Sequence, residues 1–144
     1  MPVDPPIVRR RLRRLERCLR TLQALRAGGR AAFLSDPVVQ DCAERNAEIA
    51  AQSCADVALH IVSAAGRAAP ETYADAVRAL AEEGIVSPEL AERIAAVVRL
   101  RNILVHDYID VDHGRLFDEL GWMDDAIAFA EAVERWLEAE EAKR

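Results

Sequence analysis

The chain has 144 residues, of which 51% are hydrophobic, and a formal net charge of -6 from 19 Lys and Arg against 25 Asp and Glu. This apolar content excludes a disordered chain, and the presence of only 6 Gly and 6 Pro excludes a collagen-like or linker composition. The charge is unevenly distributed, because residues 1–30 hold nine Arg against two acidic residues (+7), which leaves ten basic and 23 acidic residues (-13) for the rest. The length is typical of one domain, so we expect residues 1–144 to form a single helical domain.

Two long helices are predicted in the first half of the chain. The first begins at Pro5 and ends before Gly28, and its leucines recur every three or four residues with arginines on the other face. The second begins at Pro37, directly after the capping residue Asp36, and continues to Gly66. Both patterns indicate amphipathic helices that bury one face.

The second half of the chain predicts three further helices. A short one covers residues 73–83, a fourth begins at Ser87-Pro88-Glu89, and a last one covers roughly residues 116–140, with Asp112 as a capping residue before it. Because the connections are short, consecutive helices should pack antiparallel. The sequence therefore predicts an all-α fold, an up-and-down bundle of four to five helices.

The sequence argues against membrane insertion and against disulfide bonds. No apolar run is long enough to cross a bilayer, and the Arg-rich beginning lacks the apolar core of a signal peptide, so we expect a cytoplasmic protein without membrane contact. The three cysteines, Cys18, Cys42 and Cys54, lie in helical patterns without CxxC spacing. We expect them to be reduced residues in or near the core.

The end of the fourth predicted helix combines an apolar body with a polar cluster. The helix is apolar nearly all round, which is typical of a helix in the middle of a bundle or at a subunit interface. It ends with Arg101, Asn102, His106 and Tyr108. At 100° per residue these four side chains share one broad arc, so they can line one cleft.

These residue types suit cleavage of a phosphodiester without a metal ion. A guanidinium binds phosphate with a planar charged fork, and an imidazole can give or take a proton near neutral pH. Together they could deprotonate a ribose 2′-hydroxyl and stabilise the crowded phosphorane. The residues alone leave a structural alternative open, because Arg and His in the last turn of a helix also interact favourably with its dipole.

The octet Arg101–Tyr108 resembles the RNxxxHxY form of the motif of HEPN domains, specifically of the HepT-like toxin family. The similarity extends to residues 44–60, which resemble the family's second helix, and to residues 112–120, which resemble the beginning of its last helix. It covers roughly residues 12–137. The complete octet in a small helical chain is a fairly specific match.

The resemblance implies a homodimeric, metal-independent endoribonuclease toxin that needs no cofactor and cleaves RNA, such as tRNA or mRNA, in a cleft between two copies of the motif. Arg101 would engage the scissile phosphate, His106 would act as general acid or base, and Asn102 would orient one of them. The resemblance also implies a cognate minimal nucleotidyltransferase antitoxin (MntA-like). Such an antitoxin can silence the toxin by transferring AMP to the tyrosine of the motif, here Tyr108.

Three residues of the second predicted helix are weaker candidates for binding RNA or a partner. Asp56 and His60 lie four positions apart and are predicted to hydrogen-bond to each other, either as a satisfied polar pair near the core or in support of the cleft. Arg45 could contact RNA or the partner. The arginines of the first helix are most simply a solvated surface, although they could attract phosphate backbone or an acidic partner.

Other functions remain open at this stage. The His- and Asp-rich residues 106–113 match no metal-binding spacing, and Asp112 is better explained as a helix cap, so we expect no metal site. A protein of a different class would be a non-catalytic substrate-binding or regulatory subunit of a minimal nucleotidyltransferase, whose polar arc holds a nucleotide or a polypeptide. A third possibility is a degenerate family member that serves only as a dimerisation scaffold.

Overall fold

The computed structural model describes residues 3–106 and 111–144, and for residues 101–106 it describes the backbone alone. Every regular element in this part of the chain is a helix, which confirms the predicted all-α fold class. The helices are α1 (Pro5–Ala27), α2 (Arg30–Ser35), α3 (Pro37–Ala64), α4 (Tyr73–Glu82), α5 (Pro88–His106), α6 (His113–Asp118) and α7 (Trp122–Ala142).

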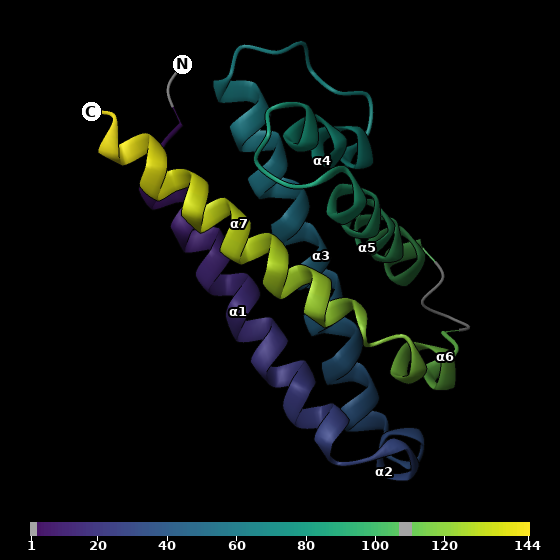
Figure 1. Cartoon of the computed structure of the whole chain (residues 1–144). Helices are drawn as coiled ribbons and strands as arrows, with labels where there is room; N and C mark the ends of the chain where they lie inside the picture. Colours follow the sequence, from purple (N-terminus) through teal and green to yellow (C-terminus); the bar gives the residue numbers. More distant parts are fainter. Residues whose placement is uncertain (1–2, 107–110) are drawn as a thin grey trace.

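Helix α3 is the centre of the bundle. It contacts α1 on one side and the antiparallel pair of α4 and α5 on the other, while α7 contacts both α1 and α5 (Figure 1). Its buried face is built largely from alanine, and these small side chains allow the neighbouring helices to approach closely. Most of the larger core side chains come from the surrounding helices and include Leu15, Phe33, Ile94 and Phe129.

The helix starts that the sequence predicted are present, with their capping hydrogen bonds. The Asp36 carboxylate accepts from the backbone N–H of Val38 at 3.0 Å, and the Ser87 hydroxyl oxygen accepts from the N–H of Leu90 at 3.1 Å. The Asp112 carboxylate caps α6 in the same way. Each of these side chains satisfies an N–H that has no partner inside its helix.

Two short helices, α2 and α6, were not predicted as separate elements. The expected connection between the first two long helices contains α2, and the expected last helix is divided into α6 and α7 at residues 119–121. Helices of one or two turns are unstable alone, so packing must hold them. Phe33 of α2 packs on Phe117 of α6 with ring centroids 5.2 Å apart, and Arg30 pairs with Asp118 at 3.0 Å.

The prediction that the fourth helix is apolar nearly all round is wrong for residues 88–100 of α5. The apolar residues Ile94 and Val97 are 0% and 3% exposed, whereas Glu92 and Arg99 are exposed. This segment is amphipathic, and its apolar side packs against α3, α4 and α7 of the same chain. These residues therefore give no support of their own to the expected dimer interface.

The cysteines lie where the sequence placed them. Cys18 and Cys54 are buried, at 2% and 0% exposure, and Cys42 is half-buried; all three are free thiols. Among the residues that can be described, no helix combines the length and the apolar character needed to span a bilayer.

Candidate functional site

The predicted motif lies at the carboxyl end of α5, on the side of the molecule where α6 begins (Figure 1). The backbone is helical through Arg101, Asn102 and His106, as predicted. The side chains of these three residues lie outside the described part of the structure, and so does Tyr108 as a whole. The structure thus gives the position of the motif-bearing helix and of the groups that hold it.

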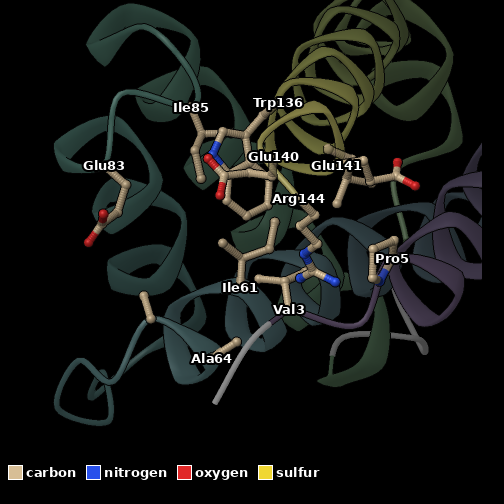
Figure 2. Close-up of a pocket in the computed structure, with 12 residues that line it drawn as sticks. Val3, Pro5, Ile61, Ala64, Glu83, Ile85, Trp136, Glu140, Glu141 and Arg144 are labelled. Carbon is tan, nitrogen blue, oxygen red and sulfur yellow. The ribbon is translucent and has the colours of Figure 1, made fainter.

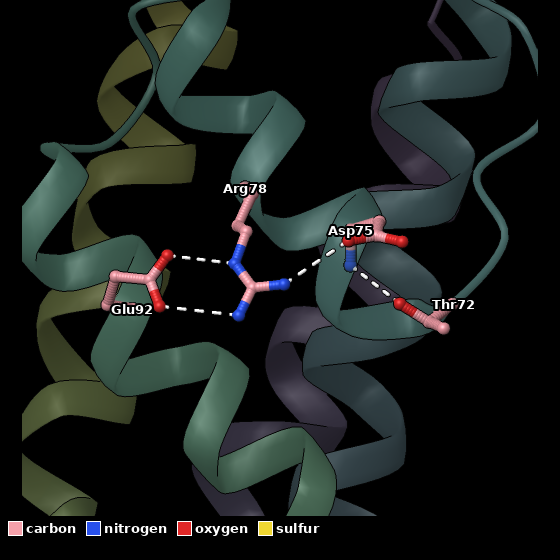
Figure 3. A network of polar contacts seen from close by, with 4 residues as sticks. All are labelled: Thr72, Asp75, Arg78 and Glu92. Atoms are coloured by element: carbon pink, nitrogen blue, oxygen red, sulfur yellow. Dashed lines mark hydrogen bonds and ion pairs between the residues drawn. The ribbon is translucent and has the colours of Figure 1, made fainter.

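Arg78 of α4 forms an ion pair with α5, as Figure 3 shows. Arg78 donates from Nε to Glu92 Oε1 at 2.8 Å and from its Nη2 to Oε2 at 3.4 Å, and its Nη1 contacts Asp75 Oδ1 at 3.2 Å. The hydrogen bond from Arg78 lowers the pKa of the Glu92 carboxyl. The Asp75 backbone N–H in turn donates to the Thr72 hydroxyl at 3.1 Å, which caps α4. This network links the start of α4 to the first turns of α5.

Two further features fix the orientation of α5. The connection from α4 is short because Gly84 adopts a left-handed conformation (φ 74°), which ends α4 and lets the Ile85 N–H bond to the Leu80 carbonyl at 2.9 Å. On the other side, Arg93 of α5 pairs with Asp125 of α7 at 2.8 Å. The motif is therefore carried by a helix held from two directions.

A hydrogen-bonded pair of side chains from α3 and α6 lies at the same end of the molecule as the motif. His113 Nε2 and Glu44 Oε1 are 2.6 Å apart, with both side chains mostly buried. Sequence reasoning missed this pair, although Glu44 lies in a segment that resembles the family and His113 in the stretch weighed as a metal site. In the structure Asp112 caps α6 and His113 binds Glu44, so both have structural roles.

The predicted hydrogen bond between Asp56 and His60 is not present in the described structure. Asp56 Oδ2 pairs with Arg11 of α1 at 2.9 Å, and His60 Nε2 accepts from the backbone N–H of Asp4 at 3.3 Å. The prediction failed because α1 and its capping residue Asp4 lie against this face of α3 and offer each residue a partner. Both residues of α3 thus bond to the beginning of the chain, at α1 or at its cap. Their predicted roles in binding RNA or a partner stay predictions.

Arg45, the third candidate on α3, is at the surface. Its side chain is 67% exposed and forms one described ion pair, with Glu48 at 3.3 Å. An exposed pair of this kind contributes little to stability. Arg45 is therefore free to exchange Glu48 for an anionic ligand.

Two hollows near the helices differ in their relation to the motif. The first, of about 250 Å³, lies at the end of the molecule near both termini and combines the apolar Ile61 and Trp136 with the acidic Glu140 (Figure 2). The second, of about 520 Å³, lies between α4 and α5 and includes Tyr73 and Arg99. Only the second reaches α5 close to the motif, since Arg99 lies two residues before Arg101.

Comparison with known proteins identifies related sequences over most of the chain. A family model described as ribonuclease HepT-like matches residues 12–133. The mRNA nuclease HepT of Shewanella oneidensis is 27% identical over 106 residues, which are 74% of this chain and 79% of that protein. The tRNA nuclease HepT of Aphanizomenon flos-aquae is 32% identical over 115 residues, which are 80% of this chain and 78% of that protein.

Solved structures show the same fold. A tri-AMPylated HEPN toxin of Shewanella oneidensis, solved in complex with its MNT antitoxin, superposes with a TM-score of 0.81 at 24% identity, over 90% of this chain and 97% of that one. The cytosolic protein YutE of Bacillus subtilis superposes with a TM-score of 0.83 at 18% identity, over 96% of this chain and 93% of that one. At these identities the superpositions establish the arrangement of helices.

Proposed function

The chain belongs to the ribonuclease HepT-like family, and we propose that it is the toxin of a toxin–antitoxin system that cleaves RNA without a metal ion. Membership of this family confirms the predicted family and the predicted enzyme class, a ribonuclease. The observation that carries the proposal is the intact RNxxxHxY octet in the sequence, whose residues 101–106 form the end of α5. The proposal includes a single-domain chain that works as a homodimer in the cytoplasm.

The proposed chemistry uses the three residues of the motif that lie on α5. His106 takes the proton of a ribose 2′-hydroxyl, or gives a proton to the departing 5′-oxygen, in general acid–base catalysis. Arg101 holds the scissile phosphate and stabilises the charge of the phosphorane, and Asn102 orients one of these two groups. The second copy of the motif in a dimer completes the cleft.

The regulation follows from the same group of residues. We propose that a minimal nucleotidyltransferase antitoxin transfers AMP from ATP to the Tyr108 hydroxyl, with release of pyrophosphate. The solved complex of a tri-AMPylated HEPN toxin with an MNT antitoxin supports this proposal. An AMP group on Tyr108 adds bulk and a negative charge, so it would compete with the RNA phosphate for Arg101.

Cleavage of total RNA by the purified protein in EDTA tests the nuclease. His106→Ala should lower the rate about 100- to 10,000-fold, because the general acid or base is lost, and should relieve growth arrest in cells. Arg135→Ala, at an exposed position of α7, is the matched control and should cleave like the wild type. A His106→Ala protein that cleaves at the wild-type rate contradicts the mechanism, and a wild-type protein without activity favours the regulatory-subunit alternative.

The transfer of AMP to Tyr108 can be tested by replacing each tyrosine in turn, because the chain contains only two. Incubation with the cognate nucleotidyltransferase and ATP should add AMP to the wild type and to Tyr73→Phe, and none to Tyr108→Phe, as measured by mass spectrometry. Tyr73 is a stringent control because it is 37% exposed at the start of α4. Labelling of the Tyr108→Phe protein would contradict the assignment.

A further inference from the structure

The outward side of α1 carries a surface made almost entirely of arginine. We use the term basic surface for five exposed residues of α1, which are Arg10, Arg13, Arg14, Arg17 and Arg20. Together with Arg11 and Ser53 they line a shallow hollow of about 570 Å³. Their spacing places all five within an arc of about 120° on the helix, along about 15 Å of its axis.

The arginines of the basic surface take part in no described ion pair. None of the five forms an ion pair with any residue whose side chain is described, whereas Arg9, Arg30, Arg78 and Arg93 each contact at least one Asp or Glu. Neighbouring like charges on a helix are unfavourable, so the free protein gains nothing from this arrangement. A bound polyanion would remove the repulsion.

A further arginine, Arg45 of α3, acts on the same buried thiol as two arginines of the basic surface. Burial raises the pKa of the Cys18 thiol, and the positive charges of Arg14, Arg17 and Arg45 act in the opposite direction. Arg14, Arg17 and Arg45 are therefore all close enough to Cys18 for their charges to act on its thiol. Arg45, a weak candidate from sequence alone, adds a positive charge on α3 to those of α1.

The composition of the basic surface favours nucleic acid over protein. Protein interfaces are built around an apolar, often aromatic centre, and the hollow on α1 is lined by six arginines and one serine. Interfaces with nucleic acid are more polar and much more positive. A guanidinium also matches the geometry of a phosphate group better than an ammonium does.

We propose that the basic surface of α1 binds the sugar-phosphate backbone of RNA and so holds the substrate at a place distinct from the motif on α5. The inference rests on the proposed function in one respect, which is that RNA is the substrate. Binding here would depend on charge and release of counterions, with no readout of bases. Recognition of the cleavage position would then belong to the motif-bearing end of the molecule.

The experiment measures binding of a short dye-labelled oligouridine by fluorescence anisotropy in EDTA. The protein carries His106→Ala, so the RNA stays intact. The test variant combines Arg13→Gln, Arg14→Gln and Arg17→Gln in α1. The matched control makes the same change in net charge elsewhere, with Arg67→Gln, Arg135→Gln and Lys143→Gln at exposed positions.

The test variant should bind oligouridine on the order of ten-fold more weakly than the control at moderate salt. The slope of log affinity against log salt should fall by about 2, because three contacts to a single strand each contribute about 0.7. Equal affinity and equal slope in the two variants would overturn the inference. His106→Ala protein with an unaltered basic surface that binds polyglutamate as tightly as oligouridine would also overturn it, and would favour an acidic protein as the ligand.

Binding and cleavage are scored separately, so the two proposals can fail independently. A protein that loses oligouridine through the α1 substitutions but never cuts RNA supports the basic surface and contradicts the nuclease. A protein that cuts RNA in a His106-dependent way but binds equally in the test and control variants contradicts the basic surface alone.

Discussion

The arginines of the basic surface on α1 and those of the α4–α5 hairpin are the same residue type in opposite situations. Arg78 and Arg93 join helices through carboxylates at 2.8 Å. The five arginines of the basic surface contact no carboxylate in the described structure and point away from the bundle. The difference shows that arginine content alone does not identify a binding surface, and that the presence or absence of a nearby carboxylate separates a structural arginine from one available to a ligand.

Both groups of arginines lie on helices that pack on one closed core. The reactivity of the cysteines tests whether this core is closed, and it should show the largest of the effects predicted here. Cys54 should react with a thiol reagent more than ~1,000-fold more slowly in the native protein than in urea, because the core must open first. The half-buried Cys42 is the internal control and should react readily. Equal labelling of Cys54 and Cys42 in the native protein would show that the core is open.

The same thiol gives a pH dependence of stability. Burial raises the pKa of Cys54 from about 9 to about 12, so the unfolded chain loses this proton first as the pH rises. The contribution of Cys54 to stability is therefore complete below about pH 9 and is lost between about pH 9 and 12. Urea unfolding of Cys54→Ala should show a weaker decline over this range than the wild type.

Removal of a helix cap should have an intermediate effect on the free energy of unfolding, and the effect should differ between α4 and α1. Thr72→Ala removes the hydroxyl that accepts from the Asp75 N–H at the start of α4, and should lower the free energy of unfolding by about 1 kcal/mol. Thr21→Ala on α1 is the matched control, because the Thr21 hydroxyl only donates to the carbonyl of Arg17 in its own helix. It should be neutral or slightly stabilising, since alanine is the better helix former.

The smallest effect is expected for the change in Tm when a single arginine is replaced, and it should depend on the salt concentration. Arg78→Gln should lower the Tm at low salt, because it breaks the contacts to Glu92 and Asp75. Arg13→Gln should leave the Tm unchanged or raise it slightly, because it relieves repulsion on α1. Both differences should shrink at high salt, where exposed charges are screened. If the two variants shift the Tm in the same direction by the same amount, the contrast between paired and unpaired arginines does not hold.

Local signals in the sequence identified the long helices and their starts. The leucine spacing of α1 and the capping residues Asp36 and Ser87 act within a few positions, so they can be recognised without knowledge of the fold. The short helices α2 and α6 could not be found in this way. They depend on the contact between Phe33 and Phe117, which lie far apart in the chain.

The candidate site was accessible to sequence reasoning for a different reason. The RNxxxHxY octet is contiguous, so its residue types and helical spacing can be read directly. The supporting contacts of Arg78 with Glu92 and of His113 with Glu44 connect different helices, and no local sequence pattern predicts them. The same limit explains Asp56 and His60, whose partners on α1 and at its cap lie more than forty residues away.

The position of α7 has a consequence for the order of events during synthesis. This helix brings Phe129, Val133 and Leu137 into the core and contacts both α1 and α5, and among the described helices it comes last in chain order. Until it leaves the ribosome, α1 lacks one of its two long neighbours and α5 lacks the Asp125 partner of Arg93. The nascent chain therefore cannot complete the support of its motif-bearing helix before α7 has been made.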